Sequence, residues 1–103
     1  MIALVTQQRD KIAEHCHRLN VRRLEVFGSA VNGNFDSEKS DLDFLVEFGK
    51  QEQVDLLTRY LDLAESLEAL FNRKVDLVTT AGSAKNPRFR ANIDAEKELI
   101  YAS

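Results

Sequence analysis

The sequence predicts one α/β (α+β) domain over residues 1–103, built on a small mixed sheet of three to four strands flanked by helices. Three observations favour this class. A chain of 103 residues has the length of one ordinary domain. Three segments carry apolar residues at helical spacing, and three others alternate apolar and polar residues as strands do. These segments follow one another as helix, strand, loop, strand, helix, strand and helix, an order typical of helices packed against a sheet.

The first part of the chain is predicted to hold a helix, a strand and a long connection. Residues 6–19 form the helix, whose apolar positions recur every three or four residues: Ile12, Cys16 and Leu19. The segment VRRLEVFGS follows as a short strand with Leu24 and Val26 on one face, and Gly28 ends it. The stretch AVNGNFDSEKS is polar and contains Asn-Gly, so we expect a turn and an exposed connection.

The middle of the chain is predicted to hold the clearest strand and the longest helix. In the strand DLDFLVEF, apolar residues occupy alternate positions: Leu42, Phe44, Val46 and Phe48. Residues 52–71 are predicted to form a helix with one buried stripe, which consists of Val54, Leu57, Leu61, Ala64, Leu67 and Phe71.

The last two predicted elements are a strand and a helix. The strand RKVDLVTT has Val75 and Leu77 on one face and Asp76 on the other. Asn86 followed by proline is typical of a helix N-cap and first turn. A C-terminal helix should therefore begin there, with its apolar residues facing inward: Phe89 and Ile93.

Charge and cysteine content narrow the classes of partner and the compartment. The net charge is −3 and the sequence shows no basic stripe, so no direct contact with nucleic acid is expected. Cys16 is the only cysteine, which excludes an internal disulfide and fits a reducing environment. The apolar run at the N-terminus is too short for a secretory signal or a membrane span. We expect a cytoplasmic protein.

Two acidic residues of the central strand are the first candidates for chemistry. Asp41 and Asp43 lie two positions apart, so both side chains leave the same face of the strand. Two ionised carboxylates that lie two residues apart on a strand repel each other by about 2–3 kcal/mol at an effective dielectric constant of about 20. A divalent cation removes this repulsion, and hard oxygen donors suit Mg²⁺. A solvated strand face is the alternative.

Asp76 and the Gly28-Ser29 pair add to this pattern. Asp76 points away from the apolar face of another short strand, so one small sheet can gather three carboxylates on one side. Two-metal phosphoryl-transfer sites need such an arrangement. Gly28 allows a phosphate to approach the backbone closely, and the Ser29 hydroxyl offers one more hydrogen bond, although Gly-Ser is also a common turn.

Taken together, these motifs resemble the signature of the DNA polymerase β-type nucleotidyltransferases. The match consists of FGS, eleven residues from Ala30 to Ser40, DLD with an apolar continuation, and the later KVDLVT. The chain as a whole resembles the minimal nucleotidyltransferase (MNT) class, including its C-terminal NPRFRANIDAEKELIYA. Members of that class are often encoded beside HEPN proteins, as the antitoxin of a toxin–antitoxin pair.

The resemblance implies a role for each candidate residue. Gly28 and Ser29 would hold the triphosphate of ATP, and Asp41 and Asp43 would bind two Mg²⁺ ions. Asp76 would complete the catalytic metal site and help to activate the acceptor hydroxyl. The implied reaction is transfer of AMP to a tyrosine of a HEPN toxin encoded by the adjacent gene, which neutralises the toxin within a hetero-oligomer. Few residues follow Asp76, which also favours an acceptor on another protein.

One departure from the family pattern leaves alternatives open. Many members carry an arginine soon after Gly-Ser, whereas this chain has Ala30 and Asn32 at those positions. A missing guanidinium weakens triphosphate binding. A catalytically weak or inactive module that neutralises its partner by docking is therefore one alternative, and a transferase for small molecules is another. The Glu14-His15-Cys16-His17 run is interpreted as structural, because its two histidines point to different faces of a helix.

Overall fold

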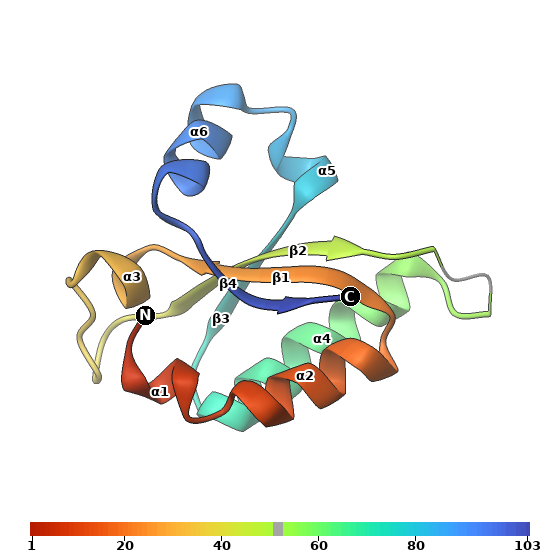
Figure 1. Cartoon of the computed structure of the whole chain (residues 1–103), viewed down its shortest axis with the longest axis horizontal. Helices are drawn as coiled ribbons and strands as arrows, with labels where there is room; N and C mark the ends of the chain where they lie inside the picture. The colour runs from red at the N-terminus through yellow and green to blue at the C-terminus, as the bar shows by residue number, and fades with distance from the viewer. Residues whose placement is uncertain (51–52) are drawn as a thin grey trace.

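The sheet is mixed, as the sequence predicts, and the computed structural model describes it within residues 1–50 and 53–103. Four strands of this part of the chain lie in the order β3-β2-β1-β4 (Figure 1). Their bounds are β1 Val21–Phe27, β2 Leu42–Phe48, β3 Val75–Thr79 and β4 Glu98–Ala102. β1 is antiparallel to both β2 and β4, and β2 is parallel to β3. The edge strands are therefore β3 and β4.

The helices cover both faces of this sheet. Their bounds are α1 Ala3–Thr6, α2 Arg9–Arg18, α3 Ser29–Asn32, α4 Leu56–Phe71, α5 Thr80–Ser83 and α6 Pro87–Glu96. α2 and α4 lie on one side of the sheet, and α5 and α6 lie on the other (Figure 1). The larger core lies between the sheet and the α2–α4 layer. A smaller cluster on the α6 side joins Phe27, Leu45 and Ile93, with Val78 packed against it.

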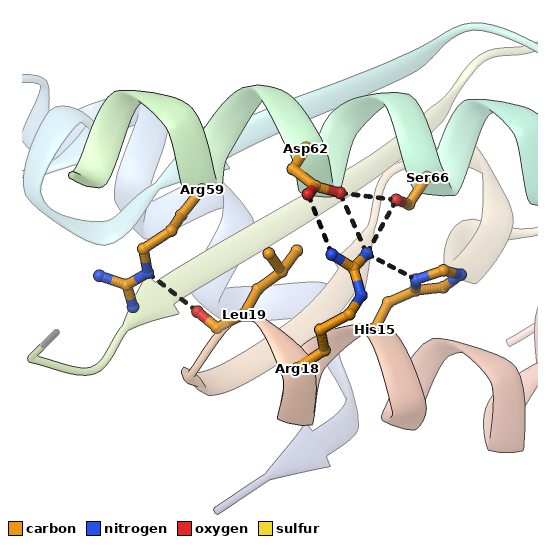
Figure 2. A network of polar contacts seen from close by, with 6 residues as sticks. All are labelled: His15, Arg18, Leu19, Arg59, Asp62 and Ser66. Carbon is orange, nitrogen blue, oxygen red and sulfur yellow. Dashed lines mark hydrogen bonds and ion pairs between the residues drawn. The ribbon is translucent and has the colours of Figure 1, made fainter. Parts of the chain in front are cut away.

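Two arginines fasten α4 to the rest of the fold (Figure 2). The Arg18 guanidinium of α2 donates to both carboxylate oxygens of Asp62, at 2.9 and 3.0 Å. The buried Arg59 donates to the backbone oxygens of Leu19, Asn20 and Gly49, which connect the ends of α2, β1 and β2. Because these carbonyls belong to loops, the guanidinium supplies hydrogen bonds that neither sheet nor helix provides.

The buried face of α4 differs in part from the predicted stripe. Leu67 and Phe71 are buried as predicted, and Arg59 and Leu63 are buried as well. The predicted Val54, Leu57 and Leu61 are instead 40%, 66% and 49% exposed. Both sets have helical spacing, so spacing alone does not choose between them. The reach of Arg59 to the loop carbonyls requires its own face to turn inward. The helix begins at Leu56, after the N-cap Asp55, and the predicted start at residue 52 lies outside the described residues.

Four elements were absent from the prediction: the short helices α1, α3 and α5, and the strand β4. The connection after β1 begins with the short helix α3, in which Ala30 is buried rather than exposed. The chain after α6 forms β4, which pairs with β1 and makes the fourth strand. The predicted cap of α6 is confirmed, because the Asn86 side chain accepts a hydrogen bond from the Phe89 amide. No helix in the described part of the chain has the length and apolar character that a membrane span requires.

Candidate functional site

The parallel pairing of β2 with β3 brings two of the predicted acids side by side. Asp43 and Asp76 are direct partners in the register of these strands. Asp43 is half-buried, and Asp76 is exposed on the edge strand. Asp41 lies just before the start of β2, and its charge acts on Asp43. The structure thus gathers the three acids at one end of two neighbouring strands.

The electrostatics of Asp43 reflect this crowding. The pKa of its carboxyl is raised to about 6, first by burial and then by the negative charge of Asp76 and a hydrogen bond with it. The charges of Asp41 and Glu96 act in the same direction. In the described residues, no lysine or arginine forms an ion pair with Asp41, Asp43 or Asp76. The cluster therefore carries negative charge that the protein itself leaves uncompensated.

Gly28 forms a sharp turn directly against Asp43. Its backbone has φ +75° and ψ −147°, a conformation that side-chain-bearing residues rarely adopt. A Cβ atom at this position would lie 2.4 Å from Oδ2 of Asp43. Phe27, the preceding residue, is the register partner of Asp43, so pairing of β1 with β2 places the turn beside the acids. Ser29 then begins α3.

A cavity of about 530 Å³ opens beside the two paired acids. Its lining consists of Phe27, Asp43, Tyr60, Val75, Asp76, Leu77, Val78 and Phe89. Phe27 and Phe89 meet edge to face with ring centroids 6.4 Å apart. The Tyr60 hydroxyl donates to the Leu77 carbonyl at 2.6 Å. The volume lies within the range of small-molecule sites, and the acids supply its charged wall.

The described residues offer Mg²⁺ only part of a ligand set. Residues 1–50 and 53–103 contain no group of three or more His, Cys, Asp or Glu side chains placed to hold a metal ion. A complete protein cage is therefore absent from the described residues. Mg²⁺ is usually bound through one or two carboxylates, with water and substrate phosphates as the other ligands. Adjacent carboxylates without a cationic partner fit that mode, in which the ion arrives with a phosphate ligand.

Some expectations for the site need correction. The acid-bearing face of β2 is not simply polar, because Leu45 on the same face is fully buried against Phe27 and Ile93. Phe89 lines the cavity but is 40% exposed, so it faces inward only in part.

The Glu14–His17 run lies in α2, away from these acids. Burial raises the pKa of Cys16 to about 12, and His15 shares a hydrogen bond with Arg18.

One residue of the site had no signal in the sequence. The Gly28 amide donates to Oε1 of Glu96 at 2.9 Å, so the last residue of α6 contacts the turn beside Asp43. Predicting this contact requires knowing that β4 exists and in which register it pairs. Because β4 was not predicted, Glu96 was not predicted to belong to the site.

Comparisons with known proteins show which family this chain resembles. The family model described as polymerase beta, nucleotidyltransferase matches residues 10–103. The protein adenylyltransferase MntA of Thermococcus cleftensis is 40% identical over 76 residues, which are 74% of this chain and 70% of that protein.

Solved structures share the fold. One described as a minimal nucleotidyltransferase is 33% identical, covers 94% of this chain and 95% of its own, and has a TM-score of 0.74. A complex of a tri-AMPylated Shewanella oneidensis HEPN toxin with MNT antitoxin contains a similar chain, with a TM-score of 0.66 at 17% identity. That match covers 95% of this chain and 72% of the other. The extent of the family match and the identity to these relatives show that the chain belongs to the polymerase beta nucleotidyltransferase family.

Proposed function

We propose that this protein is an MNT-type antitoxin that transfers AMP from Mg-ATP to a tyrosine hydroxyl of a HEPN toxin. The toxin would be encoded by the adjacent gene and neutralised within a complex of the two proteins. The observation that carries the proposal is the in-register pair Asp43–Asp76 next to the Gly28 turn. The names of the similar proteins, a protein adenylyltransferase and an antitoxin bound to an AMPylated toxin, support the choice of reaction and partner.

The residues of the site divide the reaction between them. Gly28 and Ser29 receive the triphosphate at the turn, where glycine allows close approach. Asp41, Asp43 and Asp76 would hold two Mg²⁺ ions, which would offset the charge of the phosphates and of the reacting oxygens. The cavity, whose lining includes Phe27 and Phe89, offers apolar and aromatic surface to the rest of the nucleotide.

The transfer step needs an acceptor that can reach Asp76. The tyrosine oxygen forms a bond to the α-phosphorus, and the bond from that phosphorus to the bridging oxygen of pyrophosphate breaks. The Asp76 carboxylate takes the hydroxyl proton. Asp76 is exposed and β3 is an edge strand, so a hydroxyl on the surface of another protein can approach it from outside the sheet.

A second candidate function, neutralisation by docking alone, is favoured by one observation. The residues of α3 are Ser29, Ala30, Val31 and Asn32, so this helix carries no cation. Ala30 is fully buried, and its carbonyl accepts a hydrogen bond from the Ile2 amide. The position after Ser29 therefore faces the core, which leaves triphosphate binding without a guanidinium from this helix.

Incubation with labelled ATP, Mg²⁺ and the product of the neighbouring gene separates the two functions. We expect label on the toxin with the wild-type protein, and at least about 100-fold slower labelling with Asp43→Asn or Asp76→Asn. Asp94→Asn is the matched control, because Asp94 is an exposed acid of α6 that does not line the cavity. Absence of label with the wild type, with toxin still inhibited by Asp41→Ala, would establish docking instead.

A further inference from the structure

The contact between Gly28 and Glu96 extends the ladder between β1 and β4. Val26 pairs with Glu98 in this antiparallel register. Gly28 follows the end of β1 and Glu96 lies two residues before the start of β4, and these two residues contact each other. Here a side chain replaces the backbone acceptor, since Oε1 of Glu96 accepts the Gly28 amide hydrogen at 2.9 Å. The ladder therefore ends on a carboxylate that is part of the candidate site.

Glu96 is held in place from several directions. It is the last residue of α6, and the Lys97 amide closes the helix by donating to the Ile93 carbonyl at 2.9 Å. Ile93 is fully buried on the sheet. The Lys97 ammonium group bridges Asp94 and the buried Glu25, at 3.0 and 3.3 Å. The half-buried Glu96 carboxylate thus projects from a backbone that is fixed before and after it.

The Gly28 turn lies between two carboxylates. Oδ2 of Asp43 occupies the space that a Cβ atom of residue 28 would need, and Glu96 holds the amide. A displacement of the turn would change the distance between Ser29 and the acids. The amide of Gly28 is already used, so an incoming phosphate finds its donors one residue further along, at Ser29.

We propose that Glu96 is a positioning residue for the nucleotide, which fixes the Gly28-Ser29 turn against Asp43 by accepting the Gly28 amide hydrogen bond. This role rests on the proposed function, because it acts through the triphosphate-binding turn. It needs an acceptor oxygen of the right reach and does not need the negative charge. A metal ligand would need the charge, and a competitor of the triphosphate would hinder nucleotide binding.

Four variants separate these roles. Glu96→Gln keeps the acceptor oxygen and the reach but loses the charge. Glu96→Asp keeps the charge and loses one methylene of reach, and Glu96→Ala loses both. Glu65→Gln is the control, because Glu65 is an exposed acid of α4, which lies on the other side of the sheet from α6 (Figure 1).

Two measurements on the purified protein are needed. The first is the exchange rate of the Gly28 amide hydrogen, followed by NMR without nucleotide. The second is the dissociation constant of Mg-ATP, measured together with the Mg²⁺ concentration that gives half-maximal binding. We expect about ten-fold faster exchange and about ten-fold weaker Mg-ATP binding in Glu96→Asp and Glu96→Ala. Glu96→Gln should stay within about three-fold of the wild type in both. The Mg²⁺ requirement should not change, and Glu65→Gln should match the wild type.

Each other outcome overturns the role. Equal loss in Glu96→Gln and Glu96→Ala would show that the charge matters, as for a metal ligand. Tighter Mg-ATP binding by Glu96→Ala would show that Glu96 competes with the triphosphate. If Glu96→Ala does not fold, the opposite behaviour of the Asp and Gln variants still decides. Failure of the wild-type protein to bind Mg-ATP would instead refute the proposed function, while the exchange rates would still report whether Glu96 holds the turn.

Discussion

Replacing Asp43 with asparagine is expected to stabilise the metal-free protein at neutral pH, although it removes a group that we place in the reaction. Burial, the charge of Asp76 and a hydrogen bond with it are the main causes that raise the Asp43 pKa from 3.8 to about 6. A shift of about two pKa units corresponds to about 3 kcal/mol, which solvent screening at this half-buried position reduces to about 2 kcal/mol. Asparagine removes this penalty and keeps a polar group of the same size.

The pH dependence of the penalty has a definite sign. The folded protein keeps the Asp43 proton up to about pH 6, whereas the ordinary pKa of the group is 3.8. Ionised Asp43 therefore destabilises the fold fully above about pH 6, and this penalty disappears as the pH falls toward about 4. Urea unfolding in EDTA should show Asp43→Asn more stable than wild type by about 2 kcal/mol at pH 7.5. At pH 4.5 the difference should be below about 1 kcal/mol.

A control with the opposite sign accompanies this measurement. Hydrogen bonds from Arg90 and Lys97 lower the pKa of Asp94, so ionised Asp94 stabilises the folded state. Asp94→Asn should therefore lose stability at pH 7.5, not gain it. An Asp43→Asn protein that is less stable than wild type at pH 7.5 would refute the reasoning. So would a stabilisation that stays constant between the two pH values, because it would not come from ionisation.

Four further substitutions test the Gly28 turn and the packing of α4 by urea unfolding, and the first of them is also tested by Mg-ATP binding. Gly28→Ala should cost about 2–3 kcal/mol and abolish Mg-ATP binding, because its Cβ meets Asp43 in a backbone with φ +75°. Arg59→Leu should cost about 3 kcal/mol or more, because it removes the hydrogen bonds that the guanidinium donates to three backbone carbonyls, of which Asn20 alone also accepts from the Gly49 amide among the bonds of the described residues. Leu63→Ala should cost about 2–5 kcal/mol and Leu57→Ala under about 0.5 kcal/mol, since Leu63 is buried and Leu57 is 66% exposed.

Each of these substitutions also has an outcome that would contradict the role given to its residue. A Gly28→Ala protein that binds Mg-ATP like the wild type would remove the turn from the site. Full stability of Arg59→Leu would show that apolar packing replaces the guanidinium and its carbonyl partners. Equal costs at Leu57 and Leu63 would mean that α4 does not seat on the face described above.

Sequence patterns sufficed for the elements that hold the acids. Alternation in DLDFLVEF and KVDLVT identified both strands, because each has a fully apolar face against α2 and α4. The side of the strand that bears Asp43 and Asp76 followed from period two alone. Their direct pairing did not follow, since it depends on the register of a parallel crossover that only tertiary packing sets.

The buried face of α4, strand β4 and the contact of Glu96 with Gly28 could not be predicted from local sequence patterns. Two leucine stripes compete in α4, and the choice depends on the bonds of Arg59 to carbonyls about ten to forty residues away in sequence. Strand β4 has only five residues, and a single residue separates it from the end of α6, so the sequence gives no clear boundary between the helix and the strand. The contact of Glu96 with Gly28 depends on the pairing of β4, so a prediction without β4 could not include this contact.

The parallel ladder between β2 and β3 has a consequence for how this chain can vary. The residues from Gly33 to Ser40 connect α3 to β2 and take no part in the pairing of β2 with β3. This segment can therefore change in length without separating Asp43 from Asp76. The connection from α4 to β3 has no such freedom. Only three residues separate Phe71 from Val75, so an insertion there must either shift Asp76 in the parallel register or disturb the end of α4. We therefore expect insertions and deletions to be tolerated better before Asp41 than after α4.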